Sequence, residues 1–241
     1  MKPIFCLLLA AAITILSAHA TAQTPIRPGD DHLDYSLVRP SHDFYKNITI
    51  DSAGHVLYEF MMDNTMIIDT PHQRIIFARS RQVPVGSTSM DTSITDMHLR
   101  PLVMHEWRPQ RAFDIIEHFD PELATVTITR KGVADTKTYP MKKGFFEENM
   151  IEYIFGLLIL NKDQTYVLDN FNVANSGNAP YTIKYSFDDV LNFAGDAIIP
   201  CTVLYFTYRE TTGYIWIDKS NHKVLKEIGH AAAYTYVVMK Q

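Results

Sequence analysis

Residues 144–160 read GFFEENMIEYIFGLLIL, and this stretch decides the fold because it stands alone between segments of a different type. Apolar side chains such as Phe146, Met150 and Ile154 recur in it at helical spacing. We therefore predict a helix over residues 145–160. Its apolar arc is so wide that most of the helix must be covered by other parts of the chain.

The polar residues of this segment gather on the other side of the predicted helix. Glu147 and Glu148 fall in its first turn, where negative charge suits the helix dipole. We expect these two acids to form a capped helix start, and the adjacent acids Asp188 and Asp189 to form a solvated turn. Because they are adjacent in sequence they diverge, so we do not expect them to converge on one bond as a catalytic pair.

Segments typical of antiparallel β structure surround this helix on both sides. They are rich in Val, Ile, Thr, Tyr and Phe and are separated by Gly, Pro, Asn and Asp. The predicted strands cover residues 45–50, 56–62, 65–68, 74–78, 102–107, 112–118, 125–129, 136–139, 164–169, 181–187, 201–208, 213–217, 223–228 and 234–239. Several of them are apolar on both faces, which predicts a sheet whose second face is also covered.

The fold class that follows is mainly β: a strongly curved antiparallel sheet, or half-barrel, packed around one apolar helix. We expect turns at residues 51–54 and 218–222, which carry Asp, Ser, Asn and Gly. Residues 79–95 are expected to form a loop or an irregular hairpin tip, and residues 24–34 a loosely held N-terminal segment.

The N-terminal residues resemble an export signal. Lys2 precedes an apolar run over residues 4–16, and small residues follow in A-x-A spacing. We predict a signal peptide over residues 1–22, cleaved near Ala20 to Gln23, and a single domain over residues 23–241. The apolar run is shorter than the ~20 residues of a spanning helix, so we expect no transmembrane segment in the mature chain and place it in the periplasm or outside the cell.

Composition excludes some partners. The chain has 22 Lys and Arg against 27 Asp and Glu, a net charge of -5, so no basic excess is present to neutralise phosphates. We expect no nucleic-acid partner. No Gly-rich phosphate loop precedes a helix, and we expect no cofactor.

The sequence offers no clear catalytic constellation. There is no nucleophile elbow of the G-x-S-x-G type, and Cys201 lies in an apolar segment where burial would leave its thiol inert. His105 and His118, with Glu117 nearby, would favour an enzyme or a metal site if they clustered around one point. We expect no catalytic and no metal site, hence no enzyme.

Two stretches carry a resemblance to known proteins. They read DAIIPCTVLYF over residues 196–206 and GYIWIDKSNHKVLKE over residues 213–227. Together with the order of strands, helix and strands, they resemble uncharacterised periplasmic half-barrel proteins of Gram-negative bacteria, and more distantly the LolA/LolB type of lipoprotein carrier. In those carriers a curved sheet wraps over several helices to form an apolar cleft, whereas this sequence shows one helix.

We therefore expect a non-catalytic cell-envelope protein that binds a lipid or another apolar ligand in the concave face of its sheet. The residues expected to line that face are Met61, Met66, Phe155, Leu158, Phe206 and Trp216. The alternative is a structural or interaction module that binds another envelope protein through a sheet edge or surface aromatic side chains, without a small ligand.

Overall fold

The computed structural model describes residues 23–83, 87–141, 144–172, 177–193 and 197–241. Within these ranges the chain is mainly β structure with one short α-helix, which confirms the predicted fold class. The predicted signal peptide, residues 1–22, lies outside the described residues. No helix in the described ranges has the length and apolar character needed to cross a membrane.

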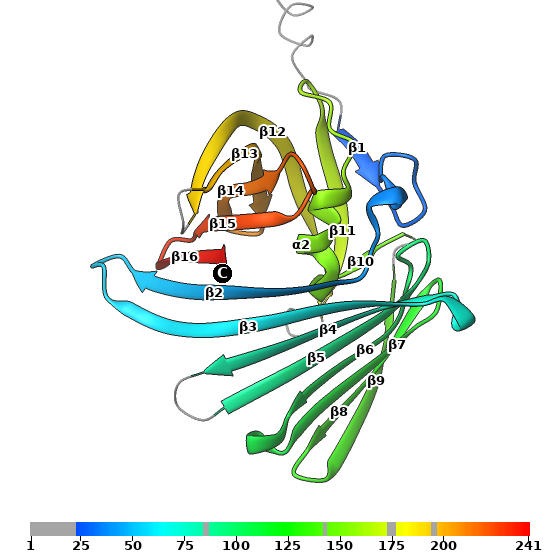
Figure 1. Ribbon diagram of the computed structural model, residues 1–241. Coiled ribbons are helices and arrows are strands. Elements are labelled where there is room, and N and C mark those ends of the chain that lie inside the picture. The colour runs from blue at the N-terminus through cyan, green and yellow to red at the C-terminus, as the bar shows by residue number, and fades with distance from the viewer. Residues whose placement is uncertain (1–22, 84–86, 142–143, 173–176, 194–196) are drawn as a thin grey trace, which may run out of the picture.

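The strands form one continuous curved sheet (Figure 1). Their bounds are β1 Gln23–Ile26, β2 Ser41–Asp51, β3 Val56–Asp69, β4 Arg74–Val83, β5 Ser87–Asp96, β6 Pro101–Arg108, β7 Phe113–Phe119, β8 Leu123–Arg130, β9 Val133–Pro140, β10 Phe146–Glu147, β11 Thr165–Asn172, β12 Gly177–Phe193, β13 Ala197–Tyr208, β14 Thr211–Asp218, β15 Val224–His230 and β16 Tyr234–Lys240. Short 3-10 helices cover Tyr35–Leu37, Thr70–His72, Pro109–Arg111 and Glu148–Met150.

The strand order gives the sheet two arms. It runs β1-β11-β12-β13-β14-β15-β16-β2-β3-β4-β5-β6-β7-β8-β9, and β10 pairs with β11. Most neighbours are antiparallel hairpins, whereas β1 and β10 pair with β11 in parallel. The last strand, β16, pairs with β2 and so joins the two arms of the sheet, β11–β16 and β2–β9. Because β1 and β9 stand at opposite ends of this order, the described sheet is open, and its two arms curve around helix α2, Ile151–Leu157 (Figure 1).

The helix is shorter than the predicted span of residues 145–160. Phe146 and Glu147 are extended as β10, Glu148–Met150 form a 3-10 turn, and Leu158 is extended again with ψ 126°. The Glu147 carboxylate accepts a hydrogen bond from the Asn149 amide at 3.0 Å, so it caps the turn that leads into α2. The apolar periodicity was real, but tertiary pairing with β11 overrides helix formation at the start of the segment.

The prediction of a loop or an irregular hairpin tip over residues 79–95 is wrong for residues 79–83 and 87–95, and residues 84–86 lie outside the described residues. Residues 79–83 belong to β4 and residues 87–95 to β5, and the two strands pair in continuous register from Arg74 with Asp96 to Val83 with Ser87. Asp91, Ser93 and Thr95 are buried although they are polar. The segment lacks the apolar alternation of an ordinary strand because its inward face is polar.

Two further expectations are corrected. The segment over residues 24–34 is held firmly, since β1 pairs with β11 and both Ile26 and Leu33 are buried in the main core. The separate strands predicted at residues 56–62 and 65–68 are one strand, β3, because Asp63 and Asn64 between them pair with Phe44 and Asp43 of β2.

The main core lies between α2 and the sheet, as expected. Ile154, Phe155 and Leu157 are buried against residues of both arms, including Phe77 of β4 and Phe206 of β13. Gly156 allows this close packing, since a Cβ placed on it would lie 2.1 Å from the carbonyl oxygen of His222. Helix α2 is thus fixed against the turn after β14.

Candidate functional site

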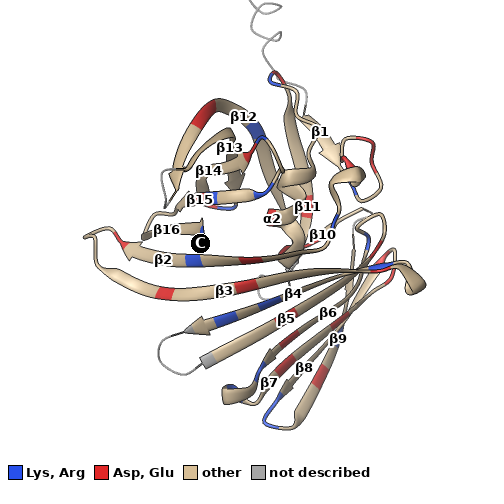
Figure 2. Ribbon diagram, viewed as in Figure 1, with Lys and Arg blue, Asp and Glu red and all other residues tan. Residues whose placement is uncertain are grey.

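A row of polar side chains crosses the concave face of one arm. Asp43 of β2 pairs with Asn64 of β3, Asn64 with Arg79 of β4, Arg79 with Asp91 of β5, and Asp91 with Glu106 of β6. Residues directly opposite one another on neighbouring strands point to the same face of a sheet. The register therefore aligns five polar residues in one row, and Figure 2 shows basic positions on β4 beside acidic positions on neighbouring strands.

The segment that enters α2 faces this row. Arg79 Nη2 lies 2.7 Å from Glu152 Oε2, and its Nε donates to Asn64 Oδ1 at 3.2 Å. Ser93 donates a hydrogen bond to Glu147. Glu147 and Glu152, which the sequence places on the side of the helix opposite its apolar face, are therefore turned toward the polar row, and Glu147 is only 3% exposed.

A cavity of about 450 Å³ lies between the polar row and this segment, and we call it the acidic cavity. Its ionisable residues are Asp91, Glu106, Glu147, Glu148, Glu152, Glu227, Arg79, Arg81 and Arg108. Apolar and aromatic walls complete it, among them Met62, Phe155, Phe171, Tyr181 and Val238. The volume falls within the range of roughly 300–1,000 Å³ that is typical of small-molecule sites.

The acidic cavity holds six acids and three arginines. Each arginine is paired with one acid: Arg79 with Glu152, Arg81 Nη2 with Asp91 Oδ2 at 2.9 Å, and Arg108 with Glu106. The three remaining acids are Glu147, Glu148 and Glu227. None of these three forms an ion pair with another described residue.

Burial shifts the proton affinity of these three acids. It raises the pKa of Glu147 and that of Glu148 to about 7, and the neighbouring Glu147 carboxylate adds to the shift at Glu148. Burial likewise raises the pKa of Glu227 to about 8, with the charge of Glu152 as a second cause. Behind the cavity, burial raises the pKa of Glu117 to about 9. Near neutral pH this interior therefore holds protons that water-exposed carboxyls would release.

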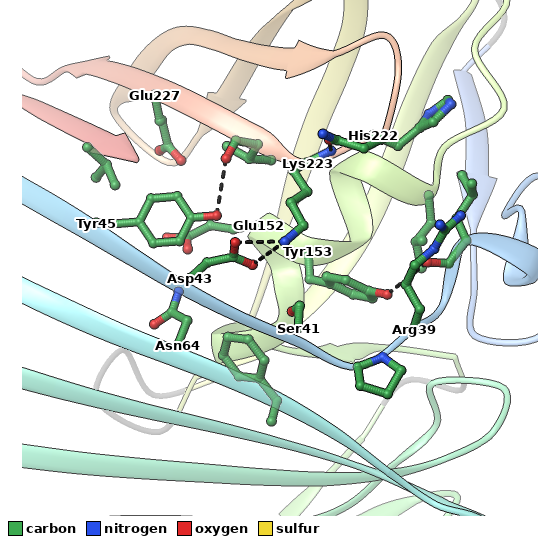
Figure 3. Close-up of a pocket in the computed structure, with 17 residues that line it drawn as sticks. Arg39, Ser41, Asp43, Tyr45, Asn64, Glu152, Tyr153, His222, Lys223 and Glu227 are labelled. Atoms are coloured by element: carbon green, nitrogen blue, oxygen red, sulfur yellow. Dashed lines mark hydrogen bonds and ion pairs between the residues drawn. The ribbon is translucent and has the colours of Figure 1, made fainter. Parts of the chain in front are cut away.

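A second cavity of about 240 Å³ adjoins the acidic cavity, and we call it the lysine-side cavity (Figure 3). Glu152, Glu227 and Val238 line both. In the lysine-side cavity Lys223 Nζ lies 2.7 and 2.9 Å from the two carboxylate oxygens of Asp43, and Lys240 also pairs with Asp43. The Tyr45 hydroxyl, which donates to the Val224 carbonyl, lies near Glu227 in Figure 3.

The six residues expected to line a ligand site are divided among different places. Met66, Phe155, Leu158 and Phe206 meet in the main core. Of the six, Phe155 alone lines the acidic cavity, and Leu158 lines a separate cavity near Asp34 and His222. Met61 is 38% exposed, because Met62 beside it takes the inward position on β3.

Trp216, the last of the six, packs in another apolar cluster with Cys201, Val203 and Leu225. Its Nε1 donates to Asp189 Oδ2 at 2.8 Å. Asp189 and Asp188 therefore belong to β12 rather than to the solvated turn expected for them, and Asp188 pairs with Lys219. Whether any of the six residues contacts a ligand stays a prediction.

Sequence reasoning missed the charged residues of the site. Arg79, Arg81 and Asp91 fell in the expected loop, and Glu147 and Glu152 on the expected solvent side of the helix. The available signal was strand-period alternation of charge, since Arg79 and Arg81 are two residues apart on β4 and both line the acidic cavity.

The histidines and the cysteine add no second site. His105 binds Asp114 on the neighbouring strand, whereas Glu117 pairs with Met104 and so lies on the other face of the sheet. Over the described residues, no group of three or more His, Cys, Asp or Glu side chains is arranged to hold a metal ion. Cys201 is buried in β13 as predicted, and burial raises the pKa of its thiol.

Comparison with known proteins assigns the sequence to a family. The model of the family described as Protein of unknown function (DUF3108) matches residues 61–232. The chain belongs to the DUF3108 family. The DUF3108 match includes every acid and arginine of the acidic cavity, from Arg79 to Glu227. No curated protein matches the sequence.

A solved structure shares the fold of this DUF3108 chain. It is described as a beta-barrel-like protein of domain of unknown function DUF1849 from Brucella abortus. The TM-score is 0.53 at 10% sequence identity, over 87% of this chain and 97% of that one. At this identity the similarity shows the fold alone.

Proposed function

We propose that this DUF3108 protein is a non-catalytic, exported protein of the cell envelope that binds a small ligand in the concavity of its sheet. The observation that carries the proposal is the acidic cavity, whose volume of about 450 Å³ and convergent polar groups are typical of ligand sites. Three of its carboxyls form no ion pair with another described residue, although Glu147 and Glu227 accept hydrogen bonds from Ser93 and Tyr236. Carboxyls that are buried without a cation can pair with a polar or charged group of a ligand.

The walls of the cavity support an amphipathic ligand. Met62, Phe155 and Phe171 offer apolar contact, and Met adapts to irregular partners. The lipid or other apolar ligand expected from the sequence would use these apolar walls, and its polar group would meet the charged residues of the cavity. The distant resemblance to LolA/LolB-type carriers stays a hypothesis that points the same way.

Export is proposed on the sequence of residues 1–22. Their short apolar run and A-x-A spacing are typical of a cleaved signal peptide. Binding is preferred to catalysis because no nucleophile motif is found in the sequence. All three arginines of the cavity are also engaged by acids.

The test uses two adjacent positions on β2. Asn47 lines the acidic cavity, whereas Ile48 points to the other face. Asn47→Trp fills the cavity, and Ile48→Trp adds the same side chain outside it. We expect purified protein to bind a fluorescent alkyl probe, Asn47→Trp to lose at least about tenfold in affinity, which corresponds to ~1.4 kcal/mol, and Ile48→Trp to bind as the wild type does. Equal binding by both variants, or no binding by the wild type, would contradict the proposal.

One observation favours the alternative of an interaction module. Strand β9 stands at one end of the sheet, and every residue from Val133 to Thr138 is exposed. An exposed edge strand can add a strand from another chain. If the wild type bound no probe but bound an envelope protein, and Ala134→Lys on this edge abolished that complex, the alternative would replace the ligand proposal.

A further inference from the structure

We propose that the ligand carries an ammonium group and that Glu227, at the junction of the two cavities, binds it. This inference rests on the proposed function and adds the chemical class of the ligand. It starts from the charge count of the acidic cavity, where three of six acids lack an arginine partner.

Glu227 is the best placed of the three unpaired acids. It lies on β15, is only 7% exposed and lines both cavities. The Tyr236 hydroxyl donates a hydrogen bond to its Oε1. Figure 3 shows its carboxylate directed toward the space beside Tyr45. A carboxylate so buried and without a cation of its own is the feature that a bound ammonium would complete.

The lysines near Glu227 are engaged elsewhere. Lys223 is held by Asp43, as described above. Lys226 lies on the same strand one position before Glu227, so it points to the opposite face, where its Nζ sits 4.8 Å from the centre of the Trp216 ring. Neither side chain supplies the charge that Glu227 lacks.

Aromatic side chains around Glu227 suit the same ligand. Tyr45 lines the lysine-side cavity, and Tyr181 and Tyr236 line the acidic cavity. Tyr181 is held rigid by stacking on Tyr208, with ring centres 4.0 Å apart. Aromatic faces attract ammonium groups, and a carboxylate among them adds charge pairing. An anionic head group would find each of the three arginines that line the acidic cavity already paired with an acid.

The apolar part of the proposed ligand would bind in a different part of the site from the ammonium group. Met62, Phe155 and Phe171 lie in the acidic cavity away from the lysine pair at Asp43. An alkylamine therefore matches both parts of the site, whereas an alkyl carboxylate matches the apolar part alone. Because burial raises the pKa of Glu227 to about 8, binding of an ammonium would have to release the proton that occupies the carboxyl.

The experiment compares three probes of equal chain length: octylamine, octanol and octanoate, each titrated into the full chain at pH 7.5 below its aggregation limit. We expect octylamine to bind at least about tenfold more tightly than octanol, and octanoate more weakly than octanol. Calorimetry of octylamine in two buffers of different ionisation enthalpy should show proton release. This measurement needs no variant and so does not depend on one folding.

Substitutions test whether Glu227 causes the preference for octylamine. Glu227→Gln keeps an acceptor for Tyr236 and should remove most of the preference for octylamine over octanol while leaving octanol affinity unchanged. Asp188→Asn, which removes an exposed acid paired with Lys219, should change neither. Circular dichroism checks that both variants fold, and Glu148→Gln provides a second cavity variant with the same expected direction.

The outcomes separate this inference from the proposed function. If octanol or octanoate bound as tightly as octylamine, or Glu227→Gln kept the preference, the ammonium inference would be overturned and the ligand site would stand. If none of the three probes bound, both would be contradicted.

Discussion

Arg79 on β4 and Glu152 on α2 form an ion pair, with Nη2 and Oε2 2.7 Å apart, that joins the sheet to the helix it encloses. The guanidinium is fully enclosed, since its side chain is 6% exposed and also donates to Asn64 Oδ1 and to the Asn149 carbonyl. Removal of one member of a buried pair leaves the other without a partner, which is costly. This contact therefore both shapes the acidic cavity and stabilises the fold.

Replacement of this arginine should be strongly destabilising. We expect Arg79→Met to lower the free energy of unfolding by about 3 kcal/mol, the lower end of the range for breaking a buried pair, because Glu152 keeps 30% exposure. Urea unfolding measures it. Arg74→Met, at an exposed position of the same strand, is the matched control and should change stability by less than ~0.5 kcal/mol. Similar losses in both variants would contradict the structural role of the pair.

Glu117 should make stability depend on pH. Burial raises its pKa to about 9 in the folded state, against about 4.3 in an unfolded chain. Between these values the folded protein binds a proton that the unfolded chain lacks, so the free energy of unfolding falls as pH rises and the loss is complete above about pH 9. Titration of this carboxyl lowers the folding equilibrium constant by up to about tenfold for each unit that the pH rises in this range.

Glu117→Gln removes that titration. Urea unfolding at pH 5, 6, 7 and 8 should show a flatter decline for the variant than for the wild type. Glu210→Gln, at an exposed position, should leave the slope unchanged. Parallel curves for the wild type and Glu117→Gln would show that the buried carboxyl is not protonated in the folded protein.

Gly156 should resist substitution even though it lies in a helix. An exposed helical Gly→Ala change stabilises by about 1 kcal/mol. Here the added methyl carbon would lie 2.1 Å from the His222 carbonyl oxygen, which is backbone and cannot swing aside. We expect Gly156→Ala to destabilise by about 1–3 kcal/mol, the usual cost of overpacking, as measured by thermal unfolding. A rise in the melting temperature would mean that α2 does not pack so closely on this turn.

Much of the fold was predictable because its elements depend on local signals. Local sequence patterns predict the apolar strands from residue 101 onward, the Asp-rich turns and the enclosed helix. These patterns do not depend on which other segments the elements pack against. In the turn after β2, Asp51 Oδ1 accepts from the amides of Ala53 and His55, and Gly54 has φ +90°, as the Asp-Ser-Ala-Gly sequence indicates. The pairing of β16 with β2 is non-local, and no hairpin rule predicts it.

The candidate site could not be predicted from the sequence, for a physical reason. Sequence patterns place charged residues on the solvent side, yet here the concave face carries them. Arg81 and Asp91 form an ion pair across β4 and β5, and Arg79 pairs with Glu152, so each charge is compensated inside the fold by a residue that the sequence does not place beside it. The sequence predicts that Glu147 caps a helix, and its carboxylate does cap the turn before α2. The same carboxylate also accepts a hydrogen bond from Ser93 inside the fold, which the sequence does not predict.

The central claim is that a ligand occupies the acidic cavity. Native mass spectrometry of the mature protein, purified gently from the cells that make it and followed by solvent extraction, tests it most directly. We predict a discrete added mass on the wild type and on Ile48→Trp, absent from Asn47→Trp, that extracts as an amphipathic molecule with an amine. The bare polypeptide mass for the wild type, with no uptake of alkyl probes, would contradict the account.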